Sequence, residues 1–400
     1  MRIGMMVDVY KPYISGITNY IDLNKRALEN DGHEVYVFTF GNLEYQDDEP
    51  RVIRSPGLPL ADTGYYLSLR YKTRARKLLQ TMDVAHVHHP FISGRLALHY
   101  CRPAQIPIVF TNHARYDLYA QARLPWMPEE VSQGLLQAYM PDFCEAVDLV
   151  ISPSHGMEKI LRQYGVEGHI EVVPNGVELK RFHTAQPLRR ADFGFTQSEI
   201  LLIFAGRIAP EKNLEFLLQS FAGVARLLPN IQLLVLGGGQ KEYEEEIKLI
   251  PNELGIQERV RFVGMIPYDR LPSYLAMCDA FVTASVTEVH PLSVIEGMAT
   301  GLPVLGIDSP GVGDSIVDGE TGLLAEDDIA SFTARLTYLC MDTDQRRKMG
   351  LAARAASAQY DIERTTRIML GHYLRLTQST KPVRRSLDER LRAVLEEFME

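Results

Sequence analysis

The 400-residue sequence lacks long hydrophobic runs, and its few cysteines show no pattern typical of a metal site or a disulfide framework. No apolar run reaches about 18 residues, so we expect no membrane-spanning helix. The amino-terminal stretch MRIGMMVDVY has an acid at Asp8, which favours a strand over a secretory signal peptide. The wide spacing of the four cysteines favours a reduced, cytoplasmic protein; they are Cys101, Cys144, Cys278 and Cys340.

The sequence also lacks an excess of positive charge, because 42 Lys and Arg residues stand against 51 Asp and Glu residues. The formal net charge of −9 argues against a general affinity for nucleic acid. Hydrophobic residues make up 46% and charged residues 23%, which is typical of a soluble globular enzyme. Because 400 residues exceed what one hydrophobic core usually serves, we expect two domains.

Short apolar segments alternate with helical patterns along almost the whole chain. Strands that alternate with helices form parallel sheets, so the pattern predicts two doubly wound α/β domains. We assign residues 1–180 to the first domain and 181–361 to the second, and we expect a helical tail over 362–400 to pack back on the first. The predicted strands are 2–9, 34–40, 84–88, 107–111, 149–152, 170–173, 200–205, 232–236, 260–264, 280–284 and 303–307.

Ligands of doubly wound sheets bind beyond the carboxyl ends of the strands, and two glutamates follow one of these ends. In TEVHPLSVIEGMATGLPV, Pro291 suits the first turn of a helix, so Glu288 lies in the entry loop and Glu296 within the helix. The N–H groups near Leu292 and Ser293 are free to bind an anion. The carboxylates can accept hydrogen bonds from sugar hydroxyls; the alternatives are an ordinary loop acid and a carboxylate paired with a core base.

The segment GRIAPEKN follows another predicted strand and combines two cations with a glycine. Gly206 lets the chain turn, while Arg207 supplies a guanidinium fork and Lys212 a point charge, a combination that suits a diphosphate. A helix that starts near Asn213 adds its positive end. The alternative is a solvated loop in which Glu211 pairs with a neighbouring base.

Two anion sites and two acids beside a cleft suggest a nucleotide sugar. The stretches SVTEVHPLSVIEGMATGLPV, GRIAPEKN, VVPNGVELKRF and LVISPSHGMEKILRQYGV together closely resemble glycosyltransferase family 4. The resemblance covers nearly the whole chain. It implies the GT-B fold, in which two Rossmann-like domains face a central cleft, and a retaining hexosyltransferase that requires no metal and no other cofactor.

The resemblance also implies roles for individual residues. Glu288 and Glu296 match the E-x7-E motif, so that Glu288 would lie beside the donor sugar and Glu296 would bind ribose hydroxyls. Arg207 and Lys212 would grip the diphosphate and stabilise the departing nucleotide. In the family's front-face route the leaving phosphate helps to accept the acceptor's proton, so electrostatic stabilisation is the main contribution of the protein.

Further roles follow from the resemblance in the same way. Gly16, in PYISGIT, would let its loop approach the phosphates, and His113, in FTNHARYDLY, would contact the transferred sugar. The base would lie near Gly264 and Met265. Pro291 departs from the family, which often has glycine there, because proline supplies no N–H.

Two other positions also depart from the family pattern. Ser15 stands where the family often has a second glycine, and Asp314 stands where it commonly has glutamate. With Pro291 in place of glycine, the phosphate would depend on the amides of Leu292 and Ser293. We assign Asp314 no role.

Histidines gather near the predicted strand end DVAHVHHPF. Metal ligation by His86, His88 and His89 is one interpretation, and a structural or acceptor-cleft role is the other. His113 is the stronger site candidate, with a core histidine as its alternative.

The acceptor is indicated by the amino-terminal half, where TNHARYDLYAQ and PYISGITNYI look most like bacterial diacylglycerol glycosyltransferases. That likeness implies a lipid acceptor and UDP-glucose as the donor. Segment 65–80 would form an interfacial helix on an anionic membrane, with Leu67, Tyr71, Ala75 and Leu78 on one face, or else pack that face on the sheet. Its five bases are Arg70, Lys72, Arg74, Arg76 and Lys77. We therefore expect a cytoplasmic protein, peripheral at the inner face of the membrane.

The sequence alone leaves other functions open. A transferase with a soluble sugar or metabolite acceptor, a nucleotide-sugar epimerase of the same fold and a non-catalytic sensor of nucleotide sugars would all bind similar donors. A dinucleotide oxidoreductase is suggested only by VLGGGQ, which lacks the GxGxxG spacing.

Overall fold

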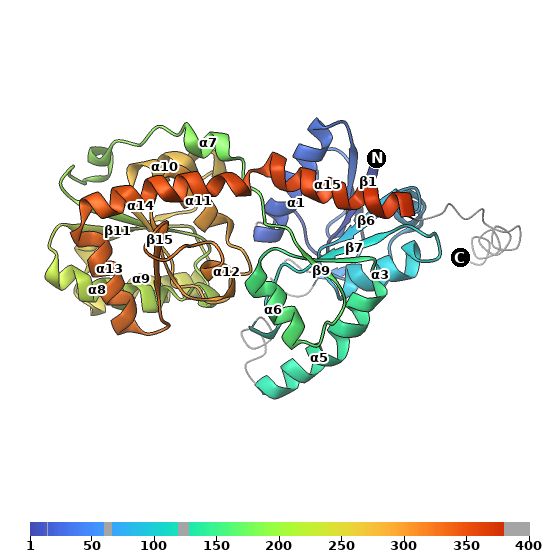
Figure 1. Ribbon diagram of the computed structural model, residues 1–400, viewed down its shortest axis with the longest axis horizontal. Helices are drawn as coiled ribbons and strands as arrows, with labels where there is room; N and C mark the ends of the chain where they lie inside the picture. The colour runs from blue at the N-terminus through green and yellow to red at the C-terminus, as the bar shows by residue number, and fades with distance from the viewer. Residues whose placement is uncertain (14, 60–65, 119–127, 380–400) are drawn as a thin grey trace, which may run out of the picture.

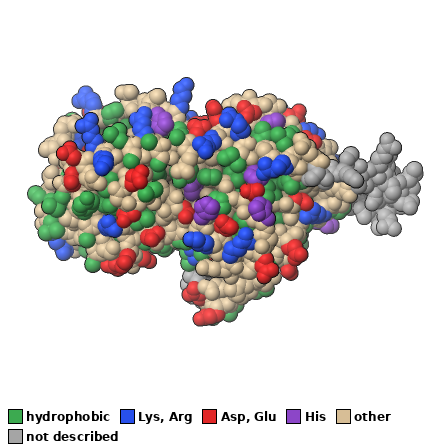
Figure 2. Space-filling model, viewed as in Figure 1, with side chains coloured by type: hydrophobic (Ala, Val, Ile, Leu, Met, Phe, Trp, Pro, Cys, Tyr) green, Lys and Arg blue, Asp and Glu red, His purple; other side chains and the backbone are tan. Residues whose placement is uncertain are grey.

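The computed structural model describes the chain except residues 14, 60–65, 119–127 and 380–400, and it has two α/β lobes side by side (Figure 1). We call residues 1–180 together with 362–379 the amino-terminal half, and residues 181–361 the carboxyl-terminal half. Charges of both signs are interspersed on the visible face of the molecule (Figure 2).

The described part of the amino-terminal half contains a seven-stranded, all-parallel sheet in the order β3-β2-β1-β6-β7-β8-β9. The order reverses direction between β1 and β6, and the loops after these strands therefore border a topological switch point. The strands are β1 (Arg2–Met6), β2 (Glu34–Phe40), β3 (Val52–Ser55), β6 (Val84–Val87), β7 (Ile108–Thr111), β8 (Leu149–Ser152) and β9 (Ile170–Val172). A short hairpin, β4 (Leu58–Pro59) with β5 (Tyr66–Leu67), lies outside the sheet.

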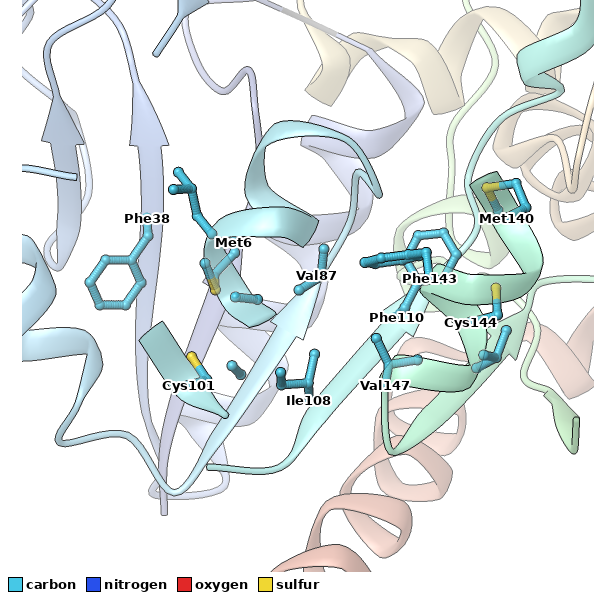
Figure 3. Close-up of a cluster of buried hydrophobic side chains, with 14 of the residues drawn as sticks. Met6, Phe38, Val87, Cys101, Ile108, Phe110, Met140, Phe143, Cys144 and Val147 are labelled. Carbon is cyan, nitrogen blue, oxygen red and sulfur yellow. The ribbon is translucent and has the colours of Figure 1, made fainter. Parts of the chain in front are cut away.

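Buried side chains fill both faces of this sheet, as expected for parallel strands covered by helices. On one face, Met6, Val87 and Phe110 belong to one buried cluster with Phe143 of α5, in which the Phe110 and Phe143 rings meet edge-on with centroids 5.1 Å apart (Figure 3). The other face is covered by α1 and α15, with Tyr373 in its core. The helices are α1 (Gly16–Asn30), α2 (Thr73–Leu79), α3 (Ile92–Cys101), α5 (Glu129–Ala146), α6 (His155–Gln163) and α15 (Ile362–Ser379).

The carboxyl-terminal half repeats the plan with a six-stranded parallel sheet in the order β12-β11-β10-β13-β14-β15. Its switch point lies between β10 and β13. The strands are β10 (Ile200–Ala205), β11 (Ile231–Leu236), β12 (Val260–Gly264), β13 (Ala280–Val282), β14 (Val304–Ile307) and β15 (Gly322–Ala325). The helices are α7 (Leu179–His183), α8 (Leu214–Leu227), α9 (Lys241–Glu253), α10 (Leu271–Met277), α11 (Leu292–Thr300), α12 (Pro310–Gly313), α13 (Ile329–Met341) and α14 (Thr343–Ala356).

Two segments join the halves and pair with each other. The Val177 N–H donates to the Tyr360 carbonyl at 2.8 Å, and the Ile362 N–H donates to the Val177 carbonyl at 3.0 Å. Beyond this pairing α15 runs back over the amino-terminal half (Figure 1), where the Tyr373 hydroxyl lies 2.6 Å from His86 Nδ1. Residues 380–400 of the predicted tail lie outside the described residues.

The structure corrects the prediction of one interfacial helix over 65–80. Residues 66–67 form β5 and helix begins only at Thr73, while position 65 lies outside the described residues. Tyr71 and Ala75 are buried among core residues that include Phe40, because their apolar surface is better covered by protein than by a lipid surface. Among the described helices, none is long and apolar enough to cross a membrane.

Candidate active site

The loop after β10 is held against the loop after β11. The Gly206 N–H donates to Leu236 O at 3.0 Å, and the Ile208 N–H donates to Gly238 O at 2.9 Å. A Cβ atom on Gly237, whose φ is 129°, would overlap the Gly206 carbonyl oxygen. The close approach therefore needs glycine at 237, whereas Gly206, which we expected to make the turn, has no left-handed φ.

Arg207 lies between the two halves of the molecule. Its Nη2 donates to Glu211 Oε1 at 2.6 Å, and its Nη1 donates to the hydroxyl of Tyr13, in the amino-terminal half, at 3.2 Å. The pairing of Glu211 with a neighbouring base, which the sequence left as an alternative, is therefore present. These two hydrogen bonds hold the guanidinium in place, although the Arg207 side chain is still 37% exposed.

Lys212 and Glu288 form an ion pair across the switch point of the carboxyl-terminal sheet. The loop that carries Glu288 is joined to the Arg207 loop, because the hydroxyls of Ser285 and Thr287 donate to the Glu211 carbonyl at 2.9 and 3.2 Å. Glu288 therefore has Lys212 as its partner within this cluster of loops.

Helix α11 follows this loop and begins at Leu292. Pro291 is its N-cap residue, not a residue of the first turn as we expected, and no side chain caps the helix. The amides of Leu292 and Ser293 stand at its amino end, where a helix leaves N–H groups without intrahelical partners. These amides can receive an anion beside the pair of Lys212 and Glu288.

Glu296 lies inside α11 and is 5% exposed. The Tyr268 hydroxyl donates to its Oε1 at 2.6 Å, so its partner is not the core base that one interpretation required. Burial raises the pKa of Glu296 from 4.5 to about 7, although the Tyr268 hydrogen bond and the charge of Arg181 act in the opposite direction. The carboxyl is therefore near its point of ionisation at neutral pH.

The residues expected to border the base lie at the same edge of the sheet. Gly264 ends β12 with a left-handed φ of 83°, and its carbonyl accepts from the Gly237 N–H at 3.0 Å. Met265 is 81% exposed, and a Cβ atom on Gly238 would lie 2.9 Å from its Cγ. Both positions are therefore contiguous with the Arg207 loop.

Gly16 is the exposed first residue of α1, and nothing lies within 4 Å of where its Cβ would be. Ser15 caps this helix: its Oγ accepts from the Thr18 N–H at 3.2 Å, and its own N–H donates to Thr18 Oγ1 at 2.7 Å. This cap explains the serine in place of a second glycine. The hydrogen bond between Tyr13 and Arg207 brings the chain just before α1 toward the Arg207 loop.

His113 is 9% exposed, and its Nε2 lies 3.0 Å from His88 Nδ1. Burial lowers the pKa of both rings well below the usual range, so both are neutral. His86 is held by Tyr373 and by Thr111 Oγ1 at 2.7 Å. These contacts support the structural interpretation of the strand-end histidines, and no group of three or more metal-ligating side chains occurs among the residues described.

Sequence patterns gave no signal for two tyrosines that complete the site. Tyr268 lies just before α10 and meets Glu296 only because α10 packs against α11. Tyr13 reaches Arg207 from the opposite half. Contacts of this kind depend on the tertiary arrangement, so neither could be identified from local spacing.

Two family models match the chain. "Glycosyltransferase Family 4" matches residues 14–181, and "Glycosyl transferases group 1" matches residues 186–356. Together these ranges span both halves and include the candidate site residues 16, 113, 207, 212, 288 and 296.

Several curated proteins are similar over most of their length. The alpha-monoglucosyldiacylglycerol synthase of Streptococcus pneumoniae is 30% identical over 342 residues, which cover 82% of this chain and 77% of that protein. The protein of the same description from Acholeplasma laidlawii is 28% identical, with coverages of 81% and 84%. The D-inositol 3-phosphate glycosyltransferase of Nocardia farcinica is 30% identical, with coverages of 76% and 68%.

Solved structures share the fold at lower identity. A sucrose-phosphate synthase from Thermosynechococcus elongatus aligns with a TM-score of 0.78 and 22% identity, covering 94% of this chain and 99% of that one. Anabaena HepE in complex with UDP-glucose aligns with a TM-score of 0.75 and 17% identity, covering 94% and 100%. The fold is therefore GT-B, with two Rossmann-like domains.

Proposed function

The chain belongs to glycosyltransferase family 4, and on that premise we propose that it transfers glucose from UDP-glucose to the free hydroxyl of diacylglycerol, with retention of anomeric configuration. The observation that carries the proposal is the meeting of Arg207, Lys212, Glu288 and Glu296 at one switch point. Two relatives described as alpha-monoglucosyldiacylglycerol synthases support the choice of glucose and of a diacylglycerol acceptor.

In the proposed reaction each candidate site residue contacts a different part of the donor. Lys212 leaves Glu288 and, with Arg207, takes up the diphosphate, whose charge grows as the bond to the sugar breaks. Glu288 then accepts a hydrogen bond from a sugar hydroxyl, and Glu296 exchanges its contact with Tyr268 for the ribose. His113, neutral and almost buried, contacts the sugar from the opposite half.

In this mechanism no side chain forms a covalent intermediate. The leaving phosphate oxygen accepts the proton of the acceptor hydroxyl as the new bond forms on the same face. The protein positions both substrates and stabilises the charge of the leaving group, and metal independence is part of the proposal.

A soluble acceptor is a second candidate, favoured by the 30% identity to a D-inositol 3-phosphate glycosyltransferase. We assign recognition of the acceptor to the amino-terminal half. The names of the two groups of relatives state different acceptors, a glycerolipid and inositol 3-phosphate. Dependence of the reaction on liposomes separates the two acceptor classes.

The test is nucleotide release from a panel of UDP-, GDP- and ADP-sugars, with and without diacylglycerol liposomes, in buffer with EDTA. We expect release from UDP-glucose that depends on the liposomes, and a new glycolipid by mass spectrometry. Release that responds only to inositol phosphate or another soluble compound would shift the assignment to the second candidate. Release that needs an added divalent cation would contradict metal independence.

We also propose that the protein acts at the cytoplasmic face of an anionic membrane. The bases of segment 65–80 stay at the surface even though Tyr71 and Ala75 of its apolar face are buried. Arg70, Lys72, Arg74 and Lys77 are exposed, and Arg76 is half-buried. Leu69, between them and β5, is 87% exposed. Bases beside an exposed leucine suit the boundary between lipid headgroups and acyl chains.

A further inference from the structure

His290 is a buried ionisable residue for which the proposed transfer has no chemical use. It lies in the donor loop, two residues after Glu288, and is 5% exposed. Burial lowers the pKa of its ring to about 4, so the ring is neutral and one of its nitrogens can accept a hydrogen bond. The contacts of His290 identify the group that donates this hydrogen bond.

The partner of His290 is Asn175, in the segment that links the two halves. The Asn175 N–H donates to His290 Nδ1 at 3.3 Å, and Asn175 Nδ2 donates to the His290 carbonyl at 2.9 Å. One residue of the linker therefore binds both the ring and the backbone of one residue of the donor loop. Asn175 is itself 8% exposed, so water competes little for these bonds.

The ring also meets the second connecting segment. The Tyr360 ring packs edge-on against His290, with centroids 5.1 Å apart. Tyr360 accepts the hydrogen bond from Val177 that pairs the two connections, and a Cβ atom on Gly176 would overlap the Thr365 hydroxyl. His290 therefore sits where the outgoing and returning segments are packed together.

The other side of the donor loop is also supported. A Cβ atom on Gly311, in α12, would overlap the Glu288 carbonyl oxygen, so α12 packs directly under the loop. Asp314, which follows α12, accepts from the Gly156 N–H at the amino end of α6 in the opposite half. The loop backbone is thus held at Glu288 by α12 and at His290 by the linker.

We propose that His290 is a positioning residue that fixes Glu288 relative to the linker and so ties recognition of the donor sugar to the arrangement of the two halves. This rests on the proposed function, in which Glu288 faces the sugar. The nucleotide is held by groups with other supports: Arg207 is oriented by Glu211 and Glu296 by Tyr268. Loss of the His290 contact therefore weakens binding of the sugar and leaves binding of the nucleotide nearly unchanged.

The test compares UDP with UDP-glucose by titration calorimetry for His290→Ala, Asn175→Ala and the double variant. The expected result is UDP affinity within about twofold of wild type and a loss of about tenfold in the preference for UDP-glucose over UDP, the size of one well-made hydrogen bond. His290→Ala removes the bond from the Asn175 backbone N–H to the ring, and Asn175→Ala removes the bond from Nδ2 to the His290 carbonyl. Each single variant therefore keeps one of the two bonds, and the double variant loses more of the preference than either single variant.

Two further variants separate positioning from general support. In His290→Asn the side-chain oxygen can accept from Asn175 in place of Nδ1, so the preference for UDP-glucose is restored. His155→Ala, at an exposed histidine of α6, is the matched control and changes neither affinity.

The outcomes discriminate sharply. Equal loss of UDP and UDP-glucose affinity, or an unchanged preference in His290→Ala, overturns the positioning role while leaving the transferase assignment intact. If the wild type binds no uridine nucleotide, the donor assignment is wrong, and the same ratio is measured with whichever nucleotide and nucleotide sugar it does bind. If it binds none, the proposed function and this inference both fall.

Discussion

Each cation on the donor side of the site already has a carboxylate partner. Arg207 pairs with Glu211, and Lys212 pairs with Glu288. A diphosphate that enters this site must replace at least one of these carboxylates as the partner of a cation. Until it arrives, the carboxylates keep both cations oriented. Arg207 can bind both Glu211 and a phosphate because its guanidinium carries five donors in a fork. The ammonium of Lys212 has three donors around one nitrogen, and in the proposed mechanism it moves from Glu288 to the diphosphate.

Lys212→Ala removes the cation that we expect to move onto the leaving diphosphate. Turnover should fall by about 10²–10³, as it does when one transition-state donor is removed from other sites. The rate of nucleotide release measures the effect, and Lys248→Ala, which breaks an exposed ion pair with Glu244 on α9, serves as the control. Near-normal turnover in the Lys212 variant would show that the phosphate lies elsewhere.

Glu296→Gln tests the buried carboxyl through its dependence on pH. Because the folded-state pKa of about 7 exceeds the ordinary 4.5, the folded protein binds the extra proton, and stability falls as pH rises between these values. At about 1.4 kcal/mol per pKa unit, the wild type loses up to about 3 kcal/mol by pH 8. The Gln variant should therefore be more stable than wild type at pH 8 and equal to it near pH 4, as followed by urea unfolding.

The same variant should bind nucleotide less tightly, because a neutral amide accepts hydrogen bonds from ribose hydroxyls more weakly than a carboxylate does. For the wild type, UDP affinity should decline as pH falls below about 7 and Glu296 takes up its proton. Calorimetry at pH 6 and pH 8 measures both effects. A Gln variant with wild-type affinity at pH 8 would exclude Glu296 from the ribose site.

The strands and helices differ in how well local sequence predicts them. Predicted strands 34–40, 149–152, 200–205 and 260–264 coincide with β2, β8, β10 and β12, because short apolar runs bounded by polar turns are typical of buried parallel strands. The prediction missed β3 and β15, which lie at sheet edges. Edge position alone does not explain this, because β9 and β12 also lie at sheet edges. The missed strands have only four residues each, VIRS with a central arginine and GLLA with a leading glycine, so neither forms a clear apolar run.

Segment 65–80 shows why one pattern can fit two structures. Its apolar spacing is compatible with a single helix, yet Tyr71 is buried by a stacked contact with Phe40, whose ring centroid lies 5.0 Å away. That contact joins residues 31 positions apart in the sequence, so local periodicity does not contain it. The candidate site also has a part that local sequence predicts and a part that it does not. Arg207 and Glu288 could be identified because they follow strand ends, whereas the contact between Asn175 and His290 exists only after folding.

Membrane contact is tested by replacing all five bases of segment 65–80 with glutamine. Binding to anionic liposomes should fall strongly, since each base near such a surface contributes about 1 kcal/mol. Sedimentation with vesicles measures it. The control replaces five exposed bases of the carboxyl-terminal half: Arg189, Arg226, Lys241, Arg347 and Lys348. Equal binding by wild type and the segment variant would end the membrane assignment for this segment.

At the scale of the whole molecule, α15 completes the hydrophobic core of the amino-terminal half, although it is far from the rest of that half in the sequence. Tyr373 is fully buried among residues of β1 and α1, and Thr366 donates to Asn24 of α1 at 3.0 Å. We therefore expect α15 to contribute to the stability of the amino-terminal half, whose core it completes. The sheet of the carboxyl-terminal half, by contrast, takes all its described strands from one continuous stretch of the chain, 200–325.

Tyr373→Ala should destabilise the amino-terminal half by about 3–5 kcal/mol, because it leaves a large cavity and removes the partner of His86. UDP affinity should change little, since the proposed nucleotide site is in the other half. Thermal unfolding with and without UDP measures both, and Ile368→Ala, at a position 41% exposed, is the control on the same helix. A single transition, shifted equally with and without UDP, would show that the halves unfold together.

The pairing of Val177 with Tyr360 and Ile362 has a consequence for how the chain can be rearranged. Residues 178–361 leave and rejoin the rest of the protein at adjacent points, which is the geometry of a domain inserted into a surface loop of another. Such a module can be excised, or its new termini moved elsewhere by circular permutation, with little disturbance to its interior. The carboxyl-terminal half could thus be exchanged between related chains at these two points without redesigning the amino-terminal half.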